Sequence, residues 1–74
     1  KRFVVFAEYT KPREADIVIA DYTLTYRKKV ISGGLNIFPR WADGKQKGIY
    51  YTKLGRRPVL YYYNIYTGER RKVA

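Results

Sequence analysis

The sequence contains no cysteine, no histidine and no methionine. Without Cys the chain forms no disulfide, and without Cys or His the usual zinc frameworks are excluded. The stability of the fold must therefore come from side-chain packing, from sheet hydrogen bonds or from a partner. The lack of Met, together with the low content of Asn and Gln, is typical of a heat-adapted protein.

Acidic residues and long apolar runs are scarce. Asp and Glu number 6 against 16 Lys and Arg, which gives a net charge of +10. The longest apolar runs, residues 3–7 and 17–20, have the length of strands and fall far short of the roughly 20 residues of a membrane helix. No signal-peptide pattern is visible. We therefore expect no membrane partner and a location in the cytoplasm, on a nucleoid or in a virion.

The chain offers no catalytic constellation. Its acidic residues are scattered, and no pair has a spacing typical of a metal site or of acid–base catalysis. Ser32 lies in a glycine turn, and Gly33-Gly34 lacks the sequence context of a phosphate-binding loop. We therefore expect a protein that is not an enzyme and that holds no cofactor or metal. The acidic residues are Glu8, Glu14, Asp16, Asp21, Asp43 and Glu69.

Alternating apolar and polar residues, rich in Val, Ile and Tyr, predict strands separated by turn signals. A chain of 74 residues is one domain, which we place over residues 1–74. The pattern predicts an all-β fold with little or no helix: an SH3-like or OB-like antiparallel barrel, or a rolled sheet, of about five to six short strands. The alternative is an open meander completed by a second copy. The predicted strands are residues 3–9, 16–30, 35–38, 49–53, 59–66 and 69–73.

The predicted strand over residues 16–30 is unusually long. One of its faces begins apolar and ends polar, so a bend or bulge near Asp21 would let the strand serve two layers. The other face is apolar along most of its length. A chain this small buries about 60–65% of its unfolded surface, which leaves room for one thin core. The candidate core residues are Val5, Val18, Leu24, Val59 and Ile65.

Aromatic residues make up 18% of the chain, with nine Tyr, three Phe and one Trp. In residues 49–66 the Tyr side chains alternate onto both faces of the strands, so some rings must face outward. Outward Tyr on a basic sheet stacks on unpaired bases, and Tyr62 and Trp41 are the candidates for this role. The alternatives are cross-strand packing of the Tyr rings and, for Trp41, closure of one end of the core.

Basic residues form clusters at the predicted strand ends and turns. Residues 36–74 carry nine basic and two acidic residues, a net charge of +7, against +3 for residues 1–35. Clusters of this kind can bracket a sheet face and contact successive phosphates. Solubility and ion pairing are the alternative, but 6 acids cannot pair 16 bases. The candidate phosphate contacts are Arg27, Lys28, Lys29, Lys45, Lys47, Arg56, Arg57, Arg70, Arg71 and Lys72.

Two resemblances to known families cover little of the chain. Tyr61-Tyr62-Tyr63-Asn64 followed by Thr67-Gly68-Glu69 resembles the second hairpin of a WW domain, a binder of proline-rich peptides. Lys72 stands where that family carries its binding Trp, so the resemblance implies shared hairpin chemistry and no ligand. In size, charge and predicted strands the chain also resembles small archaeal chromatin barrels, without a shared motif.

Together these features favour a non-enzymatic nucleic-acid-binding protein with weak sequence selectivity. Basic strand-end clusters would contact the phosphates of DNA or RNA, and Tyr or Trp would stack on bases. The alternative is a structural or protein-interaction module with a Tyr-rich interface, because Tyr and Arg are also enriched at protein interfaces. Such a module would form a homo-oligomer or a subunit of a larger assembly, including a viral or ribonucleoprotein particle.

Overall fold

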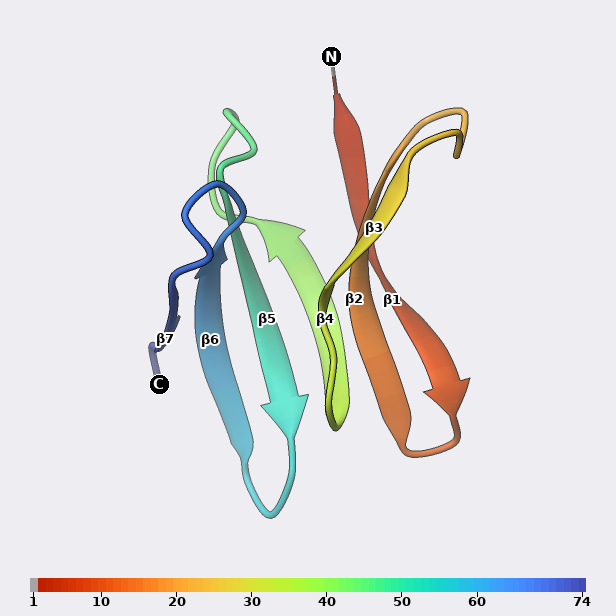
Figure 1. Cartoon of the computed structure of the whole chain (residues 1–74). Helices are drawn as coiled ribbons and strands as arrows, with labels where there is room; N and C mark the ends of the chain where they lie inside the picture. The colour runs from red at the N-terminus through yellow and green to blue at the C-terminus, as the bar shows by residue number, and fades with distance from the viewer. Residues whose placement is uncertain (1) are drawn as a thin grey trace.

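The computed structural model describes residues 2–74, which form seven strands and no helix (Figure 1). The prediction of an all-β fold is thereby confirmed. The strands, in chain order, are β1 (Phe3–Lys11), β2 (Glu14–Asp21), β3 (Arg27–Ile31), β4 (Leu35–Trp41), β5 (Gly48–Leu54), β6 (Pro58–Asn64) and β7 (Arg70–Lys72).

The strand predicted over residues 16–30 is in fact the antiparallel hairpin of β2 and β3. The chain does more than bend at Asp21: it reverses, because the Asp21 carboxylate accepts hydrogen bonds from the Tyr26 N–H and the Thr23 hydroxyl, both at 3.2 Å. Leu24 therefore lies in the turn with a φ of 60° and is 61% exposed. The prediction that Leu24 belongs to the core is wrong, because side-chain hydrogen bonds to the backbone override the apolar alternation here.

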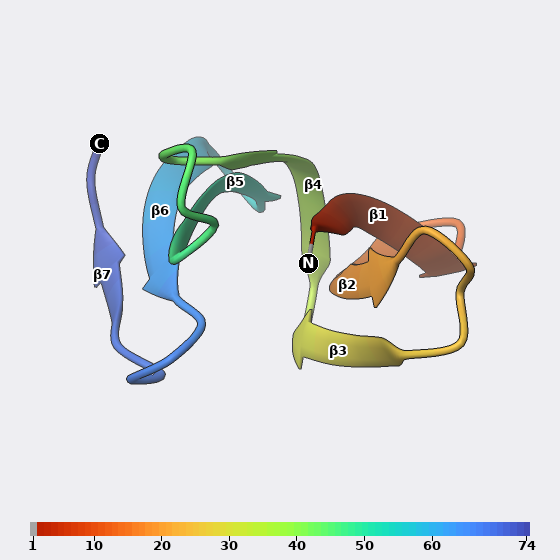
Figure 2. The same cartoon turned by 90° about the horizontal axis from the view of Figure 1, so that it is seen from above.

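The strands form one sheet that does not close into a barrel. The hydrogen-bonded order is β1-β2-β4-β5-β6-β7, and β3 pairs with β2 beside this path. All pairings are antiparallel except the short contact of β2 with β4, at Ala15 and Leu35. Seen from above, β1, β2 and β3 lie on one side, β5, β6 and β7 on the other, and β4 stands between them (Figure 2). The expected barrel closure is therefore not adopted.

Strand β4 runs past Pro39, where the sequence predicted a stop at Phe38. A register shift between Ile37 and Arg40 marks a bulge, with Phe38 at a φ of 55° and 73% exposed. A bulge removes local ladder hydrogen bonds and so accommodates proline, which has no N–H to donate. The bulge also aligns Arg40 with Tyr50 on β5.

The core lies between the two sides of the sheet. Ile17 of β2, Ile31 of β3 and Tyr51 of β5 form its buried centre, with exposed fractions of 0%, 3% and 1%. Residues 15–20 of β2 are all buried, which explains why this strand reads as a continuous apolar run. Of the predicted core residues, Val18 is buried. Val5 packs partly buried against the cluster, and Val59 and Ile65 are only half-buried.

Two amides hold the sides of the sheet together. The buried Asn36 side chain on β4 donates to the Ala15 carbonyl on β2 at 3.1 Å. The Gln46 side chain accepts from the Phe3 N–H at 2.9 Å and donates to the Phe3 carbonyl at 2.8 Å. Gln46 therefore supplies β1 with the two hydrogen bonds that a neighbouring strand would provide.

Candidate interaction surface

A row of four side chains crosses the outer face of the sheet from β4 to β7. Arg40, Tyr50, Tyr62 and Arg71 are aligned by the strand register. The Tyr50 and Tyr62 rings meet edge to face, with centroids 5.5 Å apart. The guanidinium carbon of Arg40 lies 5.4 Å from the centroid of Tyr50, and that of Arg71 lies 4.7 Å from the centroid of Tyr62. Each cation–π contact at an exposed site contributes about 0.5–1 kcal/mol.

Gly48 makes room for this row. A Cβ atom at Gly48 would overlap the ring and hydroxyl of Tyr62, which lies directly over the glycine. A residue without a side chain at position 48 therefore leaves room for Tyr62 against Tyr50 and Arg71. Tyr62, a candidate for base stacking with cross-strand packing as the alternative, is half-buried and contacts the Tyr50 ring and the Arg71 guanidinium.

The inner face of the same strands belongs to the core. The Tyr51 and Tyr61 rings are stacked, with centroids 5.5 Å apart and an interplanar angle of 16°. Burial raises the pKa of the Tyr51 hydroxyl above its ordinary value of 10.0, and the neighbouring Arg70 guanidinium opposes part of this rise. The Tyr residues of β5 and β6 thus occupy both faces, as the alternation predicts. On each face they contact one another, and on the outer face they also contact Arg side chains.

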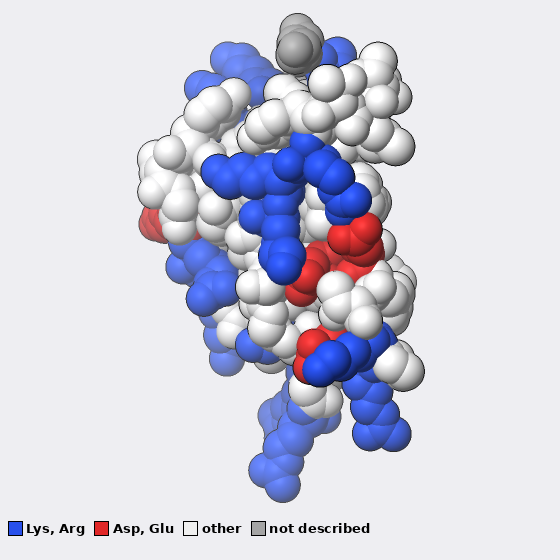
Figure 3. Space-filling model, turned by 45° about the vertical axis from the view of Figure 1, so that its right-hand side comes forward, with Lys and Arg blue, Asp and Glu red and all other residues white. Residues whose placement is uncertain are grey.

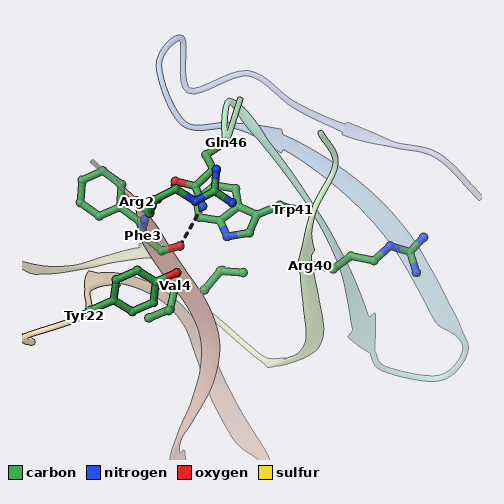
Figure 4. Close-up of a pocket in the computed structure, with 8 residues that line it drawn as sticks. Arg2, Phe3, Val4, Tyr22, Arg40, Trp41 and Gln46 are labelled. Carbon is green, nitrogen blue, oxygen red and sulfur yellow. Dashed lines mark hydrogen bonds between the residues drawn. The ribbon is translucent and has the colours of Figure 1, made fainter. Parts of the chain in front are cut away.

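Trp41 lines a hollow of about 360 Å³ beside the start of β1. Figure 4 shows its indole next to the Gln46–Phe3 hydrogen bonds, while the Arg40 side chain points away from the hollow. Tyr22 closes the opposite side and is 69% exposed. This half-buried position of Trp41 fits the alternative expectation, in which it closes one end of the core.

A second hollow, of about 570 Å³, lies at the turn between β5 and β6. Lys53, Arg56 and Arg57 supply its cations, and Val59 and Tyr61 supply its apolar side. Arg56 and Arg57 occupy the tip of the turn and are exposed. The predicted basic cluster of Arg56 and Arg57 thus borders a concave surface.

The predicted basic clusters do not form one footprint. Lys45 and Lys47 lie in the loop before β5, and the Arg56–Arg57 pair lies after it, so the length of that strand, roughly 20 Å, separates them. Arg27, Lys28 and Lys29 lie on β3, on the other side of the sheet from the cluster at residues 70–72 on β7 (Figure 2). Figure 3 shows Lys and Arg side chains spread from one end of the molecule to the other.

Two cations of the β3 cluster pair with acids. Arg27 contacts Glu8 of β1 at 2.7 Å, and Lys29 contacts the buried Asp16 of β2 at 3.4 Å. The hydrogen bond from Arg27 holds the pKa of Glu8 below its ordinary value of 4.5. At least part of this cluster therefore has a structural role.

Across residues 2–74 no three acidic side chains come together as a candidate metal site. The same part of the chain contains no helix that is long and apolar enough to cross a membrane.

Sequence reasoning missed several residues that shape these surfaces. Arg40 joins the outer row opposite Tyr50 only because of the bulge in β4, which the sequence does not reveal. Tyr50 lies opposite Tyr62 through the regular register of β5 with β6. The role of Gly48 depends on which residue lies across the strand pair. The single Gln of the chain, Gln46, in a loop otherwise rich in charge and glycine, is the one signal that could have pointed to a structural side chain there.

The chain is similar in sequence to several bacterial proteins that all carry the name TolB. The chain is 56% identical over 73 residues to the Tol-Pal system protein TolB of Wolinella succinogenes, covering 97% of this chain and 17% of that protein. It is 53% identical over 69 residues to the TolB of Helicobacter hepaticus, covering 93% of this chain and 16% of that protein. It is 42% identical over 76 residues to the TolB of Helicobacter pylori strain 26695, covering 100% of this chain and 18% of that protein. The chain thus spans less than a fifth of the length of these relatives. No protein-family profile and no solved structure gives a match.

These relatives overturn the prediction of a nucleic-acid-binding function and of a DNA or RNA partner. They are named for the Tol-Pal system and not for binding nucleic acid. The prediction rested on positive charge and exposed aromatic rings, and protein interfaces use Tyr and Arg as well. The structure accounts for part of both signals, because the β3 cations pair with acids and Tyr62 packs against Tyr50 and Arg71.

Proposed function

We propose that this chain serves in the Tol-Pal system as a non-enzymatic protein-interaction module, in the role of the matching stretch of the TolB proteins it resembles. The observation that carries the proposal is the 56% identity over 97% of the chain with the Wolinella succinogenes protein. This corresponds to the alternative that the sequence left open, an interaction module with a Tyr-rich interface.

The chemistry of the surface supports such a role. The outer row places two Tyr rings and two guanidinium groups, at Arg40 and Arg71, on one sheet face. Tyr and Arg dominate the energetically important positions of protein interfaces, because each combines a large contact area with hydrogen-bonding groups. Their mutual packing also keeps the side chains ordered before a partner arrives, which lowers the entropic cost of binding.

The non-enzymatic part of the proposal rests on the residues available. The chain has no His or Cys, and its acids are either scattered or, like Glu8 and Asp16, paired with cations. The two hollows are lined by cations, aromatic rings, aliphatic side chains and the Gln46 amide, without an acid beside a nucleophile. These surfaces suit binding and not acid–base or nucleophilic chemistry.

A chimera tests the proposal. Residues 1–74 replace the matching stretch of the Wolinella succinogenes TolB, and the purified chimera is tested for co-purification with Pal, one of the components in the name of the Tol-Pal system. We expect retention of Pal comparable to that of the unmodified protein. A chimera that carries an unrelated all-β domain in the same place is the control. Loss of Pal binding by a chimera with native circular dichroism and an unchanged unfolding temperature would contradict the proposal.

A further inference from the structure

The hollow at the turn between β5 and β6 combines charge with an apolar wall. Lys53, Arg56 and Arg57 line it together with Val59 and Tyr61, around a volume of about 570 Å³. The three cations come from a segment of only five residues, so they converge on one small opening. Neither the outer Tyr–Arg row nor the hollow beside Trp41 contains any of these residues.

The strand register fixes the shape of this hollow. Lys53 lies opposite Val59, and Leu54 lies opposite Pro58, so the pairing continues up to the turn. Tyr61 is stacked on the buried Tyr51 and is therefore held in place by the core. The apolar wall is thus rigid, while the cations at the tip are exposed and free to adjust to a ligand.

The cations of the hollow are not neutralised. Among residues 2–74 the ion pairs are Arg27–Glu8 and Lys29–Asp16, both on the other side of the sheet. Lys53, Arg56 and Arg57 thus have no carboxylate partner in the part of the chain that the structure describes. Unpaired guanidinium groups bind carboxylates through paired N–H donors, which gives geometry as well as charge.

We infer that this hollow binds an acidic peptide segment of a protein partner. Carboxylates of the peptide contact Arg56, Arg57 and Lys53, and an adjacent apolar side chain packs on Val59 and Tyr61. The apolar wall favours a peptide over a small inorganic anion, because an inorganic anion would leave that wall in contact with water. The inference rests on the proposed function, to which it adds the chemical nature of the partner.

Fluorescence anisotropy with a labelled Glu-Glu-Leu-Glu-Glu peptide tests the site on the chain itself. We expect Arg56→Glu together with Arg57→Glu to weaken binding by about tenfold or more, because the reversal replaces attraction of the peptide carboxylates by like-charge repulsion. Lys45→Glu together with Lys47→Glu is the matched control, with the same change in net charge at the other end of β5. We expect this control to change the affinity by no more than about twofold, since screening by salt limits the reach of charges to about 10 Å.

Three results would overturn the inference. Equal weakening by the two charge reversals would mean that the peptide responds to net charge alone. Equal affinity for a Glu-Glu-Gly-Glu-Glu peptide would mean that Val59 and Tyr61 contribute nothing. Displacement by inorganic phosphate as effective as displacement by unlabelled peptide would assign the site to small anions. Weaker binding of the glycine peptide and poor competition by phosphate are the expected results.

The chimera separates failure of this inference from failure of the proposed function. If the chimera retains Pal but Arg56→Glu with Arg57→Glu leaves this retention unchanged, the proposed function stands and the acidic-peptide site is wrong. If the parent chimera does not retain Pal, the proposed function fails, and the anisotropy measurement still decides whether the hollow binds acidic peptides. Circular dichroism of each variant confirms that it is folded.

Discussion

Tyr51 is the largest fully buried side chain of the described residues, and it lies in the centre of the core. It contacts the stacked Tyr61 ring and belongs to the same buried cluster as Ile17 and Ile31. A surface Tyr would contribute little to stability. In a core of this size, by contrast, one large aromatic residue supplies a substantial part of the buried apolar area.

Tyr51→Ala should therefore lower the free energy of unfolding by about 3–5 kcal/mol, the range for replacing a buried aromatic residue by Ala. Leu24→Ala, in the exposed turn after β2, should change it by no more than about 0.5 kcal/mol. Urea unfolding followed by circular dichroism measures both. Similar losses at the two positions would mean that the turn at residues 22–26 is packed and not exposed.

Gly48 gives a second residue-scale prediction. Gly48→Ala places a methyl group inside the Tyr62 ring, so the ring must leave its position against Tyr50 and Arg71. We expect a loss of about 1–3 kcal/mol, as for overpacking. Gly44→Ala is the control, because a Cβ at Gly44 meets no atom within 4 Å. Thermal unfolding measures the loss, and the combination with Tyr62→Ala should recover part of it. Equal stability of the two glycine variants would contradict the packing of Tyr62.

At the scale of elements, the sequence predicts most strands and misses how they are joined. Period-2 alternation locates β1, β5 and β6 to within two residues at each end. It fails at Leu24, because alternation continues through a turn that Asp21 organises. It also fails at Pro39, where a bulge lets β4 continue. The predicted basic clusters and Tyr62 are at the surface, but the pairing of Arg40 with Tyr50 depends on a register that only the folded sheet sets.

The junction of β1 with the loop before β5 depends on one side chain. Gln46→Ala removes the acceptor of the Phe3 N–H and the donor to the Phe3 carbonyl. A fully buried unpaired group costs about 1–3 kcal/mol, and these part-buried groups should cost less. The start of β1 should therefore open more often. Hydrogen exchange at the Phe3 amide should therefore accelerate. Gln46 has a φ of 57°, which Asn tolerates better than Ala, so Gln46→Asn separates lost hydrogen bonds from backbone strain. If the hydrogen-exchange rate of the Phe3 amide is unchanged in both variants, the Gln46 side chain does not hold the start of β1.

The Glu8–Arg27 pair links β1 to β3 across β2, and it should make stability depend on pH. Because the pKa of Glu8 is lowered in the folded state, the pair stabilises the fold above the ordinary value of 4.5. This contribution is lost as the pH falls through the folded pKa. Glu8→Gln should therefore lower the urea midpoint at neutral pH and have little effect well below pH 4.5. A difference between variant and parent that grows toward low pH would contradict this assignment.

At the scale of the whole molecule, charge alone does not identify the partner. A net charge of +10 creates a field that attracts any polyanion, but the structure distributes its cations over both sides of the sheet and both ends of β5. Such a distribution, with a cationic hollow that has an apolar wall at the turn between β5 and β6, suits a protein surface better than a continuous phosphate backbone. The proposed role in the Tol-Pal system is consistent with this arrangement.

Hydrogen exchange of the TolB chimera, measured with and without Pal, shows whether residues 1–74 respond to the partner. If residues 1–74 act as an interaction module, Pal should slow exchange within them, and most strongly around the turn between Leu54 and Pro58. Such protection reports contact or ordering at individual amides, whereas co-purification reports only that the whole protein binds. Unchanged exchange throughout residues 1–74, with protection confined to the rest of the chimera, would contradict the claim.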